Sequence, residues 1–311
     1  MKILIVSGFL GAGKTTFIQS LASHTGKALA IFENEYGISG IDGDRLRNQQ
    51  NAGTVNIWEM TESCICCSAK GDFAASVLTI ANAADPEYLV VEPTGVAMLS
   101  KIIENLKQIR YERISLLSPV TIVDIHSWTR YLQEYPGLYK DQIREAGTII
   151  VSKTENSGFA EKEEIRKMLE KINPAAHVIM EPSSSFSPST WMKFLETNFD
   201  GTSEKLHLEI PQELPDSFSL QDVSGNSVEE LILFLEGLIR GQYGNIIRAK
   251  GQIPIGTQNL QFDMTDRRYR LTGTDTVSSG KMVFFGSKIL RREIRRHFCI
   301  KDSLHKWVIS I

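Results

Sequence analysis

The chain has 311 residues, of which 23% are charged, and its formal net charge at pH 7 is −3. This length leaves room for about two domains of ~150 residues each, and the slightly negative charge favours no general attraction to nucleic acid. No run of about 18 apolar residues is present in the sequence, so no membrane span is predicted.

The first predicted elements are a buried strand over residues 2–7, a glycine-rich loop and a helix that starts near Thr15. The loop reads GFLGAGKTT from Gly8 onward and matches the phosphate-binding pattern GxxxxGK[ST]. In such a loop the backbone N–H groups and the helix N-terminus attract phosphate, Lys14 adds a full positive charge, and the Thr15 hydroxyl binds Mg²⁺. We therefore expect a nucleoside triphosphate to contact Gly11, Ala12, Gly13, Lys14, Thr15 and Thr16.

Strands and helices then alternate along the chain. Further strands are predicted over residues 27–33, 55–58, 88–91, 119–123, 148–151 and 177–180. Helices are predicted over residues 72–83, 99–109, 161–172 and 191–195. This alternation indicates parallel strands joined by crossover helices, so the predicted fold is an α/β, doubly wound, mostly parallel sheet of the P-loop NTPase type.

The alternating pattern ends in a stretch rich in serine, proline, glycine and charge, which predicts a linker over residues 200–215 between domains 1–199 and 216–311. Strand-like runs in the second domain cover residues 218–223, 245–250, 259–264, 268–271 and 282–285. Helices are predicted over residues 228–240 and 290–298, so the second domain is expected to be a smaller α+β unit. The arginines of the last helix are expected to form a solvated face.

A cluster of three thiols lies between the predicted strand 55–58 and the helix 72–83. Cys64, Cys66 and Cys67 cannot all point into one apolar core, and thiolates bind ions such as Zn²⁺. Three thiolates are one ligand short of a closed tetrahedral coordination shell. An incomplete shell suits a metal ion that the protein must release. Two alternatives remain open: a redox C-x-x-C pair of Cys64 and Cys67, or small buried cysteines. Clustered thiols argue against a disulfide framework and favour a cytoplasmic protein.

The third chemical feature is Glu92-Pro93-Thr94-Gly95, which follows the predicted strand 88–91 directly. In P-loop enzymes this position holds a carboxylate near Mg²⁺ and a glycine N–H near the γ-phosphate. The pattern ExxG is weak by itself, and its place after a buried strand makes it more specific. Glu92 is therefore expected beside Mg²⁺ and Gly95 beside the nucleotide.

Together these features resemble the CobW-like GTPases, which are relatives of the nickel-insertion GTPases of urease and hydrogenase maturation. The resemblance rests on GFLGAGKTT, on ENEYG at residues 33–37 with Asp42 beyond it, on the CxCC at residues 64–67, and on the ExxG. RAKG at residues 248–251 and the strand-like runs after it also resemble the small second domain of that family. The resemblance to this family extends over almost the whole chain.

The resemblance implies a GTP-hydrolysing metallochaperone or metal-insertion factor for Zn²⁺ or Co²⁺. Its turnover is expected to be slow, because no arginine finger or positioned glutamine stands out near these motifs. Its client would be a metalloprotein or a cofactor-dependent enzyme. The implied catalytic residues are Lys14, Asp42 and Glu92, with Mg²⁺ held by Thr15 and assisted by Asp42 or Glu92. Glu33 is an additional candidate metal ligand beside the cysteines.

One departure from the family concerns the base of the nucleotide. The family reads guanine with Asn-Lys-x-Asp, whereas residues 152–155 here are Ser152-Lys153-Thr154-Glu155. A carboxylate at the fourth place accepts hydrogen bonds from the guanine N1–H and amino group, which adenine does not offer. Glu155 keeps this charge on a side chain longer by one methylene group. We expect Ser152, Lys153 and Glu155 to bind guanine with weakened selectivity against adenine.

Two other functions fit the same residues. The chain could be a nucleotide-dependent switch that remodels a cofactor-dependent partner, such as a corrinoid enzyme, with structural or redox-sensing cysteines. It could also be a thiol redox protein with a nucleotide regulator. Neither a membrane nor a nucleic-acid partner is expected. The oligomeric state stays open, with a homodimer as one alternative.

Overall fold

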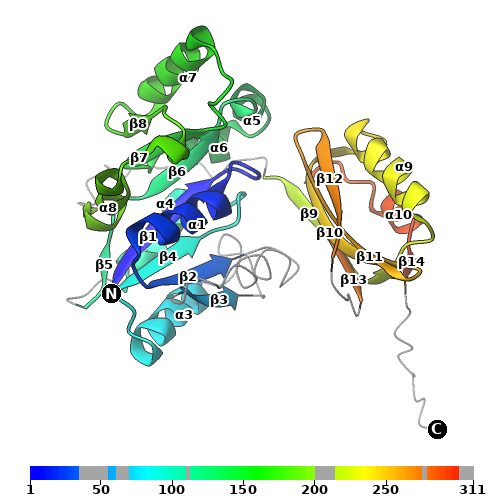
Figure 1. The fold of residues 1–311 in the computed structure, drawn as a ribbon, viewed down its shortest axis with the longest axis horizontal. Coiled ribbons are helices and arrows are strands. Elements are labelled where there is room, and N and C mark those ends of the chain that lie inside the picture. Colours follow the sequence, from blue (N-terminus) through cyan, green and yellow to red (C-terminus); the bar gives the residue numbers. More distant parts are fainter. Residues whose placement is uncertain (35–54, 61–69, 110–112, 200–213, 275–278, 301–311) are drawn as a thin grey trace. The chain divides into compact units, whose positions relative to one another are not determined.

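The computed structural model describes residues 1–34, 55–60, 70–109, 113–199, 214–274 and 279–300 (Figure 1). The chain forms two compact units, Met1–Leu214 and Pro215–Ile311. Within the described ranges, no helix is long and apolar enough to cross a membrane.

The first unit is built on a parallel sheet whose main path has the order β3-β2-β4-β1-β6-β7-β8, with β5 also paired to β1. The strands pair in parallel with their neighbours, because their connections are crossovers through helices. Their bounds are β1 (Lys2–Gly8), β2 (Leu29–Asn34), β3 (Val55–Met60), β4 (Tyr88–Glu92), β5 (Ser115–Leu116), β6 (Val120–Asp124), β7 (Thr148–Ser152) and β8 (His177–Ile179).

Helices cover both faces of this sheet (Figure 1). One face packs against α1 and α8, and the other packs against α3 and α4. The helices are α1 (Lys14–Thr25), α3 (Lys70–Ala83), α4 (Leu99–Lys107), α5 (Trp128–Glu134), α6 (Pro136–Arg144), α7 (Phe159–Ile172) and α8 (Pro188–Glu196), and Ser183–Ser185 forms a short 3₁₀ turn. The predicted doubly wound α/β class is confirmed.

Helices α5 and α6 were missed by the sequence analysis. Two neighbouring polar residues of α6, Asp141 and Gln142, are buried in the protein. Buried polar residues interrupt the apolar spacing by which a helix is recognised in a sequence. The proline at Pro136 occupies the first position of α6, where its missing N–H costs no hydrogen bond.

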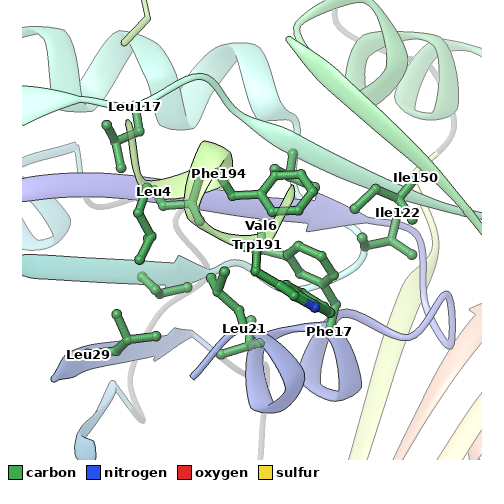
Figure 2. Packing of buried hydrophobic residues seen from close by; sticks show 14 of the residues in the cluster. Leu4, Val6, Phe17, Leu21, Leu29, Leu117, Ile122, Ile150, Trp191 and Phe194 are labelled. Carbon is green, nitrogen blue, oxygen red and sulfur yellow. The ribbon is translucent and has the colours of Figure 1, made fainter. Parts of the chain in front are cut away.

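An aromatic cluster fixes helix α1 behind the P-loop. Figure 2 shows Trp191 and Phe194 of α8 against Phe17 and Leu21 of α1. The ring centroids of Phe17 and Trp191 are 5.4 Å apart, and those of Phe17 and Phe194 are 5.2 Å apart in an edge-to-face arrangement. Such pairs stabilise beyond their buried area, so the start of α1 is held firmly against the sheet.

The second unit is an antiparallel sheet of order β12-β11-β10-β13-β9-β14, with α9 (Val228–Ile239) and α10 (Arg291–Arg295) packed on one face. This arrangement confirms the predicted α+β class. The strands are β9 (Asp216–Ser224), β10 (Asn245–Ile255), β11 (Gln258–Thr265), β12 (Arg268–Gly273), β13 (Gly280–Ser287) and β14 (Cys299–Ile300). In α10, Ile294 is buried and the arginines are exposed, with Arg291 paired to Asp216 at 2.7 Å.

Candidate functional site

The loop between β1 and α1 depends on glycines at three positions. The backbone φ angles of Gly8, Gly11 and Gly13 are 141°, 74° and 105°, values that side chains of L-residues rarely allow. At Gly8 a Cβ atom would also lie 2.4 Å from the carbonyl oxygen of Ile122 on the neighbouring strand. These glycines therefore fix the chain between the end of a strand and the N-terminus of a helix, where P-loops bind phosphate.

Lys14 is the first residue of α1, and its side chain folds back over the loop. Its Nζ atom donates hydrogen bonds to the carbonyl oxygens of Gly8, at 3.0 Å, and of Phe9, at 3.4 Å. The residue is 8% exposed. The positive charge is thus held at the loop, which is where the P-loop pattern places it.

Thr15 and Glu92 meet at the carboxyl edge of the sheet. The Thr15 hydroxyl donates a hydrogen bond to Glu92 Oε1 at 2.8 Å, across 77 residues of sequence. Glu92 is the last residue of β4, and β4 pairs with the strand that leads into the P-loop. A hydroxyl and a carboxylate are hard oxygen ligands of the kind that Mg²⁺ prefers, so these two residues fit a magnesium ion.

Glu33 lies beside Glu92. The two residues are register partners on the adjacent strands β2 and β4, and Glu33 is 5% exposed. Neighbouring carboxylates at one sheet edge favour a cation. The other predicted metal ligands, Cys64, Cys66 and Cys67, and the predicted catalytic Asp42 lie outside the described residues. Among the residues that are described, no group of three or more His, Cys, Asp or Glu side chains forms a metal site.

Gly95 packs directly against the P-loop. A Cβ atom on Gly95 would lie 2.5 Å from the backbone nitrogen of Leu10 and 2.8 Å from its Cα atom. Backbone at that distance cannot yield as a flexible side chain could, so only glycine allows this approach. The ExxG segment and the P-loop are therefore in contact at two residues, Glu92 and Gly95.

The segment predicted to read the base also contacts the P-loop. The Ser152 hydroxyl donates to the carbonyl oxygen of Ala12 at 2.7 Å, so this side chain braces the loop. Lys153 has a φ of 62° and forms an ion pair with Asp124, a buried residue that ends β6. Asp124 is not among the site residues expected from the sequence, although a carboxylate at the carboxyl end of a buried strand is a usable signal. Glu155 is exposed.

Two residues of α6 that the sequence analysis missed hold the segment after Glu92. Gln142 donates from Nε2 to the carbonyl oxygens of Gly95 and Ala97. Asp141 Oδ2 accepts a hydrogen bond from the Ser100 backbone N–H at 3.2 Å. Burial raises the pKa of the Asp141 carboxyl above its ordinary value of 3.8, and the hydrogen bonds from Ser100 oppose that rise.

The raised pKa of Asp141 predicts a pH-dependent stability difference. The folded chain binds this proton more tightly than the unfolded chain, so the contribution of Asp141 is favourable at low pH. It is lost as the pH rises from the unfolded pKa through the folded pKa. Asp141→Asn cannot ionise and keeps an acceptor for Ser100. Its unfolding free energy, relative to the parent chain, should therefore increase between about pH 4 and pH 8 in urea denaturation. A difference that is constant over this range would contradict the prediction.

Comparison with known proteins gives one family match and several relatives. The model of the CobW/HypB/UreG nucleotide-binding domain matches residues 2–180. Zinc chaperone YjiA of Escherichia coli is 26% identical over 326 residues, covering 96% of this chain and 98% of YjiA. Zinc chaperone CobW of a Sinorhizobium species is 34% identical over 126 residues, covering 39% of this chain and 35% of that protein.

Among solved structures, the Zn(II)-bound YjiA GTPase from Escherichia coli is similar at 20% identity and a TM-score of 0.48, with 96% of this chain and 97% of that chain covered. The family match spans more than half of the 311 residues and includes the P-loop, the CxCC and the ExxG. The resemblance found in the sequence is thereby confirmed. The chain belongs to the CobW/HypB/UreG family of nucleotide-binding proteins.

Proposed function

We propose that this protein is a GTP-hydrolysing metallochaperone or metal-insertion factor. It binds GTP at the P-loop, carries Zn²⁺ or Co²⁺ on Cys64, Cys66 and Cys67, and couples transfer of that metal to a client protein to the state of the nucleotide. The observation that carries the proposal is the 2.8 Å hydrogen bond between Thr15 and Glu92, which joins the P-loop to the strand end that carries the ExxG. The naming of two relatives as zinc chaperones supports the metal part.

In this proposal the residues of the nucleotide site have separate roles. Lys14 stabilises the charge of the β- and γ-phosphates, and Gly95 offers its N–H group to the γ-phosphate. Thr15, assisted by Glu92 or Asp42, would hold Mg²⁺, which neutralises phosphate charge when it is bound. The sequence shows no residue pattern typical of an arginine finger near these motifs, so intrinsic hydrolysis should be slow, well below ~1 s⁻¹.

The base is read by the end of β7 and the residues after it. Glu155 accepts hydrogen bonds from guanine, while Lys153 is held next to the site by Asp124. Ser152 contributes by bracing the P-loop at Ala12. Because Glu155 is longer than the aspartate usual in the family, guanine is preferred over adenine less strictly.

The metal part of the proposal predicts that each chain binds one Co²⁺ or Zn²⁺ ion, with the three cysteines as thiolate ligands. Titration with Co²⁺ should produce the intense visible bands of tetrahedral thiolate coordination and should release protons. Cys66→Ser should weaken binding by more than ~10-fold, since loss of a residue that merely orients a ligand already costs about that much.

The matched control for Cys66→Ser is Cys299→Ser. Cys299 is an exposed cysteine of the second unit, and its thiol donates to Asn226 Oδ1 at 3.2 Å. The control variant should bind Co²⁺ like the parent chain. Octahedral, oxygen-type spectra would show that the thiols are not ligands. That result would favour the second candidate, a nucleotide-dependent switch that remodels a partner enzyme.

A further inference from the structure

The turn that follows Glu92 is held by one buried side chain of α6. Gln142 is 1% exposed, and its Nε2 donates to the carbonyl oxygens of Gly95 at 3.1 Å and Ala97 at 3.0 Å. The turn is closed by its own hydrogen bond, from the Ala97 N–H to the carbonyl oxygen of Thr94 at 3.0 Å. One amide group thus donates hydrogen bonds to two carbonyl oxygens of the same turn.

The residue before Gln142 holds the helix that follows the turn. Helix α4 begins at Leu99, and its N-cap residue, Met98, has no side-chain acceptor for the first N–H groups. Asp141 of α6, which is 0% exposed, supplies this acceptor: its Oδ2 accepts a hydrogen bond from the Ser100 N–H. Neighbouring residues of α6 therefore fix both the turn and the start of the next helix.

Helix α6 is itself anchored to the strands beside the P-loop. The buried Thr121 hydroxyl donates to the backbone carbonyl oxygen of Gln142 at 2.8 Å. Thr121 lies on β6 and is the register partner of Ser7 on β1, one residue before the P-loop begins. The amide of Gln142 is thus positioned by the same strands that position the phosphate-binding loop.

The turn held by Gln142 packs closely against the P-loop. A Cβ atom on Gly95 would lie 2.5 Å from the Leu10 nitrogen, so the Gly95 backbone is in direct contact with the loop. A shift of the turn would change the distance from the Gly95 backbone to the P-loop and to any phosphate bound there. The hydrogen bonds from Gln142 to Gly95 and Ala97 oppose such a shift.

We propose that Gln142 is a positioning residue for nucleotide discrimination, which holds Gly95 at the P-loop in the arrangement that receives the γ-phosphate. Asp141 fixes the start of α4 in the same arrangement. The inference rests on the proposed function, in which the Gly95 N–H faces the γ-phosphate. Because GDP has no γ-phosphate, loss of the Gln142 hydrogen bonds weakens binding of the triphosphate and leaves binding of GDP nearly unchanged.

The test uses Gln142→Met in the full chain, which keeps side-chain length and removes both donors. Dissociation constants are measured for GDP and for a non-hydrolysable GTP analogue, and kcat and KM are measured for GTP hydrolysis. We expect the Kd of the analogue to rise by roughly 5-fold or more, the low end of common coupling, and that of GDP to change by less than about 2-fold. The value of kcat should fall, since the turn also positions the reacting phosphate.

Asn173→Leu is the matched control. Asn173 is a buried amide that donates to the carbonyl oxygens of Ile143, Arg144 and Ala146 at 2.8–2.9 Å, at the end of α6. This substitution removes hydrogen bonds of the same kind in the same unit, so it should lower Tm without changing the ratio of the two dissociation constants. If Gln142→Met unfolds below the assay temperature, Gln142→Asn replaces it, because it keeps an amide and withdraws the donors by one methylene group.

Two results would overturn the inference. One is a ratio of the two dissociation constants, analogue to GDP, that Gln142→Met leaves unchanged, whether or not both affinities fall. The other is a ratio that shifts as much in Asn173→Leu as in Gln142→Met. A parent chain that binds both nucleotides, together with an unchanged ratio in the Gln142 variants, removes the positioning role and leaves the proposed function intact. A parent chain that binds neither nucleotide removes both.

Discussion

Replacing Lys14 with alanine should abolish tight binding of the nucleoside triphosphate. The Lys14 ammonium is held at the P-loop by the carbonyl oxygens of Gly8 and Phe9 and is buried there. Hydrogen bonds from a charged donor contribute ~1.5–3 kcal/mol each, so loss of two such bonds to phosphate corresponds to a rise in Kd of ~100-fold or more. Titration with a fluorescent GTP analogue, together with a turnover assay, measures the effect.

Lys27→Ala is the matched control for Lys14→Ala. Lys27 precedes β2, at the opposite edge of the sheet from the P-loop, and its Nζ lies 3.9 Å from Glu87 Oε2. Both substitutions remove one positive charge, so a general electrostatic effect would appear in each. Only Lys14→Ala should lose binding. GTP turnover at the parental rate in that variant would show that the P-loop is not the catalytic pocket.

Metal affinity should differ between the GTP and GDP states by roughly 5- to 150-fold, which corresponds to a coupling free energy of ~1–3 kcal/mol. The segment with the cysteines leads directly into α3. Phe73 of α3 stacks on Phe32 of β2 with ring centroids 5.6 Å apart, and the next residue, Glu33, is the register partner of Glu92. These contacts connect the start of α3 to Glu92, where we propose that Mg²⁺ binds, and γ-phosphate commonly orders such segments in P-loop proteins.

The coupling is measured by titrating Zn²⁺ or Co²⁺ in the presence of GDP and of a non-hydrolysable GTP analogue. Linkage requires that the metal change the affinity for the analogue, relative to GDP, by the same factor. In Lys14→Ala, which should not bind the analogue, the two metal affinities should become equal. Equal affinities in the parent chain would leave a metal site without nucleotide control, and the metallochaperone mechanism would fail even if both ligands bind.

The local elements of this protein could be predicted from its sequence. Gly8, Gly11 and Gly13 take backbone conformations that other residues rarely adopt, so their spacing was enough to predict the turn from strand to helix. Apolar runs predicted the central strands to within about two residues, because residues buried on both faces of a parallel sheet leave a continuous signal. The short strand β5 and the helices α5 and α6 left no such signal.

The contacts between distant residues of the candidate site could be found only in the folded structure. Gln142 contacts Gly95 across 47 residues of sequence, and Ser152 contacts Ala12 across 140 residues. Spacing along a chain reports the period of one helix or strand, and it carries no information about which polar side chain will lie under a turn from another element. Asp141 and Gln142 are polar residues that would be expected on the surface, and they are buried because the backbone groups of the turn and of α4 provide their hydrogen-bond partners.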